Sequence, residues 1–192
     1  PRRSRAALHI AHVSSAAAVA EIDAFREAVG SLRLTAETCP HYFALTAAAL
    51  RAAGTNAKMN PPLRGQEDVA AVRDALSRGA IQVIATDHAP HAPAEKATDL
   101  ASAPAGVVGL ETALGLVLQG LVAPGVLSLP EALGAMTWAP ARALGLPAGR
   151  LAEGAPADLT LIDLEATWTV DPERFYSLSR NTPFDGWTLR GR

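Results

Sequence analysis

The sequence has little of what marks several specialised classes of protein. Its 192 residues contain one cysteine, Cys39, which excludes a disulfide within the chain and is compatible with a reducing compartment. No apolar run reaches the roughly 18 residues that a membrane-spanning helix needs. Lys and Arg number 17 against 19 Asp and Glu, so the net charge is only −2. We therefore expect a cytoplasmic protein that binds neither nucleic acid nor a membrane.

The chain also lacks an initiating Met, and its last residues, 187–192, resemble a strand cut in mid-course. We expect a piece of a longer protein, with sequence missing on both sides. Hydrophobic residues make up 49% of the chain and charged residues 19%, which is typical of a globular chain with a large core.

Short apolar runs alternate with amphipathic segments up to about residue 145. The patterns predict strands at 6–13, 32–38 and 81–85. Helices are predicted from Ser14 or Ser15 to about Val29 (with Gly30 placed to end it) and at 47–53, 66–77 and 110–122. One or two further helices are predicted at 129–144, after a possible cap at Ser128. Further strands are expected at 159–164 and 167–170. This order predicts part of an α/β barrel in residues 1–148 and a β appendage in residues 149–192.

Polar residues follow the apolar run 81–85, which is typical of a strand buried on both faces. Asp87 and His91 stand at its C-terminal end, where an α/β barrel places its chemistry. Asp87 offers an oxygen ligand for a metal or a proton acceptor, and His91 a hydrogen-bond donor. The alternative is that Asp87 caps a turn and the histidines lie on a loop surface.

All five histidines lie in or beside the polar stretches at predicted strand ends, and none lies in a predicted helix. His12 ends one strand and Asp87 follows another, so a parallel barrel can bring them to one face. An imidazole and a carboxylate suit a catalytic zinc, which keeps an open position for water. Alternatively, His12 is a buried histidine bonded to the backbone.

Four motifs together resemble the dihydroorotases, a group of cyclic amidohydrolases. In order they are HVSS at 12–15, ETCPHY at 37–42, KMNPPLR at 58–64 and TDHAPH at 86–91. Matches at 95–96, 103–106, 109–112 and 181–186 extend the resemblance over essentially the whole chain. The ETCPHY motif resembles allantoinases and dihydropyrimidinases at least as well.

The resemblance implies the C-terminal portion of a (β/α)8 TIM barrel, followed by strands of a small β-sandwich. It implies a binuclear metal centre, usually zinc, with a bridging hydroxide. His12 would bind one metal, and Asp87 would bind the other and act as the catalytic acid–base. The remaining metal ligands of the family lie upstream of this chain.

The resemblance also implies which residues bind a small-molecule substrate. Asn60 and His91 would contact its ring and carboxylate, and main-chain groups of Ala105 and Gly106 would touch it. The family has a bulky residue where Ala105 stands, which puts the side-chain packing there in question. His41 is left open, as a structural residue or one that supports the ligands. Cys39 is interpreted as a small buried residue, and His88 is expected to point away from the site.

The implied activity is the interconversion of N-carbamoyl-L-aspartate and (S)-dihydroorotate in pyrimidine biosynthesis, with a possible homodimer or a complex with aspartate transcarbamoylase. One alternative is an allantoinase or dihydropyrimidinase. Another is a non-catalytic, dihydroorotase-like partner of aspartate transcarbamoylase. The 192-residue chain alone is expected to be inactive, because part of a barrel leaves a sheet edge unpaired and the metal site incomplete.

Overall fold

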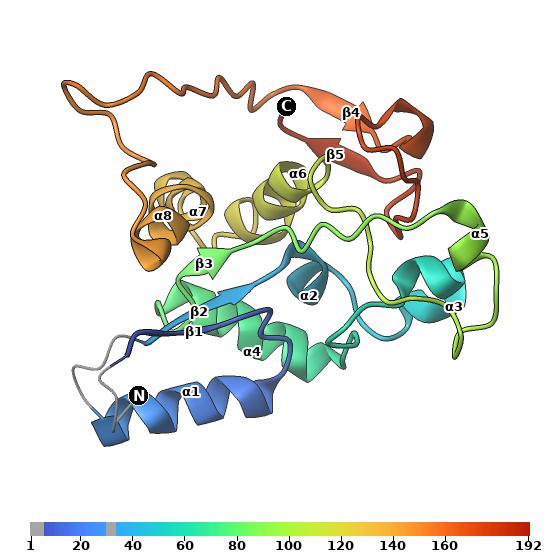
Figure 1. Ribbon diagram of the computed structural model, residues 1–192, viewed down its shortest axis with the longest axis horizontal. Helices are drawn as coiled ribbons and strands as arrows, with labels where there is room; N and C mark the ends of the chain where they lie inside the picture. The colour runs from blue at the N-terminus through green and yellow to red at the C-terminus, as the bar shows by residue number, and fades with distance from the viewer. Residues whose placement is uncertain (1–5, 30–33) are drawn as a thin grey trace.

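Three short parallel strands form the centre of the fold. In the computed structural model, which describes residues 6–29 and 34–192, β1 (Leu8–Ile10), β2 (Leu34–Thr38) and β3 (Val83–Ile84) lie in the order β1-β2-β3 (Figure 1). Hydrogen bonds from Gln82 and Ala85 to β2 extend the last pairing, as the predicted strand 81–85 requires. Because the strands are parallel, their carboxyl ends meet at one edge of the sheet.

Two helices pack against each other below the sheet in the view of Figure 1, α1 (Ala16–Val29) and α4 (Gln66–Ser77). The start of α1 is held by Ser15, whose Oγ accepts the Ala18 N–H at 3.2 Å. The side chain of Asp68 in α4 accepts the Ala16 N–H at 2.9 Å and ties the two helices together. The predicted end of α1 at Gly30 and the start of the predicted strand at 32 lie outside the described residues.

A second group of helices lies on the opposite side of the sheet: α6 (Ala113–Val117), the π-helical turn η2 (Leu118–Val122), α7 (Leu129–Met136) and α8 (Trp138–Leu144) (Figure 1). Ser128 and Glu131 form the expected cap of α7: Ser128 Oγ accepts the Glu131 N–H, and the Glu131 carboxylate accepts the Ser128 N–H. The expectation that the apolar helix begins at Leu110 is wrong, because Leu110 precedes α6 and is 60% exposed. Within the described residues, no helix is both long and apolar enough to cross a membrane.

Short helices connect these layers. They are α2 (Pro40–Ala44), α3 (Ala49–Ala53), the 3-10 turn η1 (Gly54–Ala57) and α5 (Pro93–Lys96). The predicted helix at 47–53 corresponds to α3, and 58–64 is non-helical as its prolines require. The sequence patterns missed α2, which begins at Pro40 because a proline fits the first helical position, where its missing N–H costs nothing.

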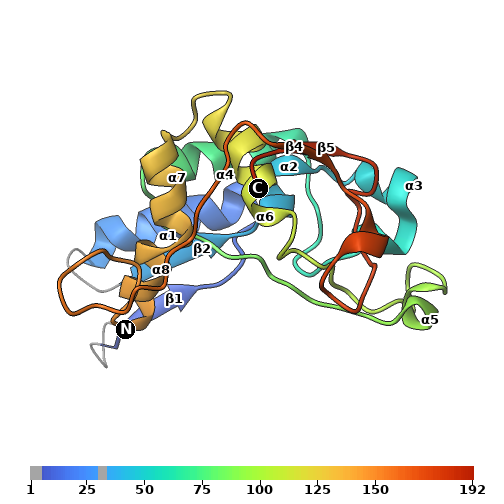
Figure 2. The same ribbon diagram turned by 90° about the horizontal axis from the view of Figure 1, so that it is seen from above.

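A two-stranded hairpin ends the chain. Strand β4 (Thr167–Thr169) pairs antiparallel with β5 (Thr188–Arg190), the 3-10 turn η3 (Pro172–Arg174) lies between them, and β5 contacts α6 and η2 (Figure 2). The strand predicted at 159–164 is wrong: the segment forms no strand, its backbone pairing is limited to two hydrogen bonds between Asp163 and Arg192 in the described chain, and Leu161 is 94% exposed. Val170, Phe184 and Leu189 share a hydrophobic core with Cys39 and other residues that precede position 148 in the sequence. The division at residue 148 stays a prediction, and this core crosses it.

Candidate metal centre

The backbone turns sharply where β1 and β3 end. His12 and Asp87 have φ angles of +41° and +48°, and within the described residues they are the only non-glycine positions with positive φ. Side chains at such positions are uncommon, because the left-handed region is sterically costly for residues with a Cβ. Strain of this kind concentrates at functional sites. Both residues lie at the carboxyl edge of the sheet.

His41 adds a third side chain to this edge. It stands in the first turn of α2, directly after β2, and is 2% exposed. Its Nε2 atom lies 3.8 Å from Oδ2 of Asp87 and has no hydrogen-bond partner among the residues that the structure describes. A buried nitrogen without a partner needs an explanation, such as an ion that belongs there.

The surroundings of His41 keep its ring neutral. Burial, and after it the charge of nearby His12, lowers the pKa of His41 from 6.5 to about 3. A metal binds the neutral imidazole through a ring nitrogen that carries no proton. The unbonded Nε2 beside a carboxylate therefore fits a metal ligand.

Whereas the pKa of His41 is lowered, that of the Asp87 carboxyl group is raised. Burial raises its pKa above the usual value, His12 opposes this rise, and Glu37 adds to it. The charge of His12 acts on both His41 and Asp87, and all three residues lie at the carboxyl edge of the sheet, but the compact group of possible ligand atoms in the described residues contains His41 and Asp87 without His12. A carboxyl group with a raised pKa is suited to gaining and losing a proton.

The thiol of Cys39 completes a compact group. One ligand atom from each of Cys39, His41 and Asp87 lies within 4.8 Å of the other two. However, burial first, and then the charges of Asp87 and Glu37, raise the pKa of the Cys39 thiol well above its ordinary value. Metals bind the thiolate, so this environment favours His41 and Asp87 as ligands. Cys39 belongs to the hydrophobic core, in agreement with its interpretation as a small buried residue.

The expected substrate-binding residues meet beside α5, except for Asn60. The ring of His91 donates from Nε2 to the Ala105 carbonyl at 3.0 Å. The Gly106 N–H donates to the carbonyl of Lys58 at 2.9 Å, which joins this loop to the segment that carries Asn60. Asn60 itself is exposed. The side chains and main-chain groups predicted to bind the substrate thus come from three separate chain segments.

The ring of His88 makes hydrogen bonds to the backbone of a neighbouring loop. Its Nδ1 accepts the N–H groups of Gly109 at 3.1 Å and Leu110 at 3.4 Å, and a backbone bridge joins it to Val107. A Cβ atom at Gly109 would lie 2.5 Å from the carbonyl oxygen of Thr86. The loop at 107–110 is therefore packed directly against the strand end that carries Asp87.

Sequence reasoning left His41 undecided and did not single out Lys96 or Asn181, both of which are buried polar residues beside His91 and Gly106. The signal for His41 was present: it follows a strand end, as the other histidines at this edge do. Lys96 and Asn181 lie in the stretches 95–96 and 181–186 that match the dihydroorotases, but no pattern assigned them a role: the partners of Lys96 Nζ are 8 and 10 residues away, and those of the Asn181 side chain are 75 to 92 residues away.

A model of the amidohydrolase family matches residues 6–191. The chain belongs to the amidohydrolase family. A curated relative, the dihydroorotase of Syntrophotalea carbinolica, is 53% identical over 189 residues, or 98% of this amidohydrolase chain and 44% of the relative. The dihydroorotase of Pelotomaculum thermopropionicum is 54% identical over 185 residues, which cover 96% and 43% of the two chains. This chain spans less than half the length of these relatives, and the resemblance to dihydroorotases is confirmed.

Solved structures agree on the fold. The dihydropyrimidinase from Brevibacillus agri matches with a TM-score of 0.90 and 27% identity, over 99% of this chain and 43% of that one. The L-hydantoinase from Arthrobacter aurescens matches with a TM-score of 0.90 and 31% identity, over 99% and 43% of the two chains. The predicted fold class of this amidohydrolase, part of an α/β TIM barrel, is confirmed.

Proposed function

We propose that the full-length protein is a dihydroorotase, which interconverts N-carbamoyl-L-aspartate and (S)-dihydroorotate in the cytoplasm for pyrimidine biosynthesis. The observation that carries the proposal is the buried His41 Nε2 atom, unbonded among the described residues and 3.8 Å from the Asp87 carboxylate. Curated relatives that are 53% and 54% identical to this chain bear the name dihydroorotase, which supports this choice of substrate.

His12, His41 and Asp87 would hold a binuclear zinc centre together with ligands from residues outside this chain. Zinc takes imidazole nitrogen and carboxylate oxygen, the donors that these three residues offer. When bound, such a centre supplies Lewis acidity and makes water a strong nucleophile near neutral pH. His41 contributes a neutral ring, because burial lowers its pKa to about 3.

Asp87 would move the proton of the reaction. In the hydrolytic direction its carboxylate accepts the proton that water loses as it attacks the ring carbonyl. It then gives that proton to the departing amide nitrogen, and ring closure runs the same steps in reverse. Burial raises the pKa of Asp87, which makes its carboxylate a better proton acceptor than an exposed one.

Asn60, His91 and the main chain at Ala105 would bind the substrate. An amide side chain such as that of Asn60 has both a donor and an acceptor, which suits the edge of a cyclic amide. The Ala105 N–H donates to no protein acceptor among the contacts of the described residues. That group is therefore available to a substrate oxygen.

A dihydropyrimidinase or hydantoinase is the second candidate function. The TM-scores of 0.90 to proteins with those names favour it. Those proteins are at most about a third identical to this chain, whereas the relatives named dihydroorotase are more than half identical. A non-catalytic partner of aspartate transcarbamoylase is disfavoured, because His12, His41 and Asp87 are all present.

The test uses the purified full-length protein loaded with zinc. Its turnover is measured with dihydroorotate, N-carbamoyl-L-aspartate, dihydrouracil, hydantoin and allantoin. We expect turnover of the first two, with the others at least about 100-fold slower. Turnover of dihydrouracil, hydantoin or allantoin without dihydroorotate would reject the proposal. Size-exclusion chromatography with and without aspartate transcarbamoylase tests the proposed homodimer and that complex.

A further inference from the structure

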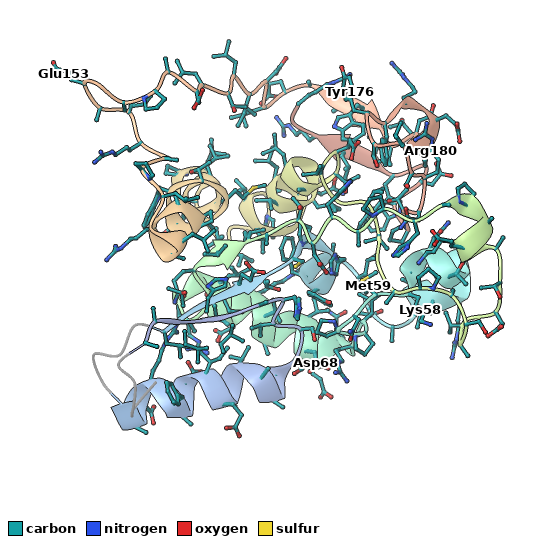
Figure 3. The ribbon with its side chains drawn as sticks, viewed as in Figure 1. Lys58, Met59, Asp68, Glu153, Tyr176 and Arg180 are labelled. Atoms are coloured by element: carbon teal, nitrogen blue, oxygen red, sulfur yellow. The ribbon has the colours of Figure 1, made fainter. Side chains whose placement is uncertain are left out.

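Both main-chain groups of Gly106 are engaged by the protein. Its N–H donates to the Lys58 carbonyl, and its carbonyl accepts from Lys96 Nζ at 3.0 Å and from Asn181 Nδ2 at 3.1 Å. Figure 3 labels Lys58, which follows η1, and Arg180, which directly precedes Asn181 in the sequence. Gly106 is thus an anchor of the loop, and its main chain is not free to bind a ligand.

Lys96 is buried to an unusual degree for its type. Lys96 is 5% exposed, and its Nζ also donates to the Pro104 carbonyl at 2.9 Å. Burial lowers its pKa, and the nearby charge of Lys58 adds to this. Burying an ammonium group is unfavourable unless it is well bonded, so the carbonyls of Pro104 and Gly106 determine where this side chain lies.

Asn181 joins two loops with one side chain. Its Nδ2 donates to the carbonyls of Ala89 at 3.0 Å and Gly106 at 3.1 Å, and its Oδ1 accepts the His91 N–H at 3.1 Å. The residue is 4% exposed. It therefore fixes the segment that carries His91 relative to the segment that carries Ala105.

The backbone at Gly106 leaves little room for another arrangement. Its φ angle is +132°, and an added Cβ would lie 2.5 Å from the Ala89 Cβ and 3.1 Å from the His91 ring. With Gly106 held on both sides, the neighbouring Ala105 N–H is the main-chain donor that remains for a substrate.

We infer that Lys96 and Asn181 are positioning residues for substrate binding, which act through the Gly106 carbonyl to aim the Ala105 N–H and the His91 ring. Neither side chain need touch the substrate. This inference rests on the proposed function, because it takes His91 and Ala105 as parts of the substrate site. It predicts a loss of substrate affinity with little change in metal binding.

The first test compares three variants of the zinc-loaded full-length protein. Asn181→Asp keeps the acceptor for the His91 N–H and removes both donated bonds. Lys96→Met removes the ammonium group and keeps most of the side-chain volume. Asp99→Ala is the matched control, since the Asp99 carboxylate accepts the Ala101 and Ser102 N–H groups in the same loop and has no hydrogen bond with Gly106 among the described residues.

We expect Asn181→Asp and Lys96→Met each to raise KM for dihydroorotate at least about tenfold, with kcat and zinc content within about threefold of wild type. Asp99→Ala should leave KM close to wild type. An unchanged KM in both site variants would overturn the inference, and so would an equal effect in Asp99→Ala. If the wild type turns over a different cyclic amide, the proposed function fails and the same comparison is made with that substrate.

Hydrogen exchange gives a second readout that needs no activity. We expect exchange of the amides at 105–108 to be faster in Asn181→Asp and Lys96→Met than in wild type, and unchanged in Asp99→Ala. Equal exchange in all four proteins would overturn the inference even if the substrate were unknown. If one site variant does not fold, the other carries the comparison.

Discussion

The Nε2 atom of His41 lies 3.8 Å from Oδ2 of Asp87, although the two residues follow different strands. The parallel pairing of β2 with β3 brings them together, because both strands end at the same edge. The short helix α2 then turns His41 into the buried space beside Asp87. Together with the charge of His12 nearby, this contact is the basis of the proposed metal centre.

Replacing Asp87 with Asn in the full-length protein should lower kcat by at least about 100-fold. The amide has nearly the same shape but cannot accept and return a proton, and loss of an acid–base group has effects of this size. Steady-state kinetics with dihydroorotate measures the change. Asp185→Asn, at an exposed carboxylate, is the control and should keep its rate. A nearly normal rate in Asp87→Asn would exclude the role assigned to this residue.

Replacing His41 with Ala should reduce the zinc bound per chain. The change removes the buried ring nitrogen that lies beside Asp87. Zinc is measured by elemental analysis after dialysis. His88→Asn is a matched control, since an amide oxygen can accept the Gly109 N–H as Nδ1 of His88 does. Equal zinc content in His41→Ala and wild type would contradict the assignment of His41 as a ligand.

The stability of the metal-free protein should depend on pH through His41. Its pKa is about 3 in the folded protein and 6.5 ordinarily, so the unfolded chain binds the proton more tightly. The stabilising contribution of the neutral ring is therefore complete above about pH 6.5 and is lost as the pH falls toward 3.

The comparison with His41→Gln isolates this effect, because Asp87 and the other carboxyl groups are common to both proteins. Lowering the pH from about 7 to about 5 should reduce the unfolding free energy of wild type by about 2 kcal/mol relative to that of the variant. Denaturant titrations of metal-free full-length protein measure it. A difference that is constant with pH would show that His41 titrates normally.

Replacing Gly109 with Ala should impair both stability and activity. The new Cβ would lie 2.5 Å from the Thr86 carbonyl oxygen, directly before Asp87, so the strand end or the loop must move. We expect unfolding to be easier by about 1 to 3 kcal/mol, the scale of overpacking in a core, and kcat/KM to fall. Gly65→Ala is the control, since a Cβ there meets nothing closer than 3.7 Å. Equal stability of the two variants would contradict this packing.

Much of the sheet and of the edge that carries the site could be predicted from the sequence. The amphipathic pattern at 66–77 is long enough for its periodicity to identify a helix, and the short apolar run at 81–85, followed by polar residues, indicates a buried strand. Parallel strands end at a common edge, which was sufficient to bring His12 and Asp87 to the same side of the sheet.

The sequence could not give what depends on short or distant contacts. Helix α2 has only five residues, too few for a periodic pattern, so the direction of His41 was left open. The segment 159–164 alternates like a strand, but in the described chain its backbone pairing is limited to Asp163, which exchanges two hydrogen bonds with Arg192, and alternation alone does not supply a full partner strand. Asn181 contacts His91 across 90 positions, and no local pattern predicts such a contact.

The location of bound zinc tests the account most directly. Crystals of the zinc-loaded full-length protein would be examined by anomalous scattering at the zinc edge. We predict metal within coordination distance, about 2.0 to 2.2 Å, of a ring nitrogen of His12, a ring nitrogen of His41 and a carboxylate oxygen of Asp87, with these ligands divided between two ions. Zinc bound elsewhere, with His41 Nε2 and Asp87 contacting no metal, would contradict it.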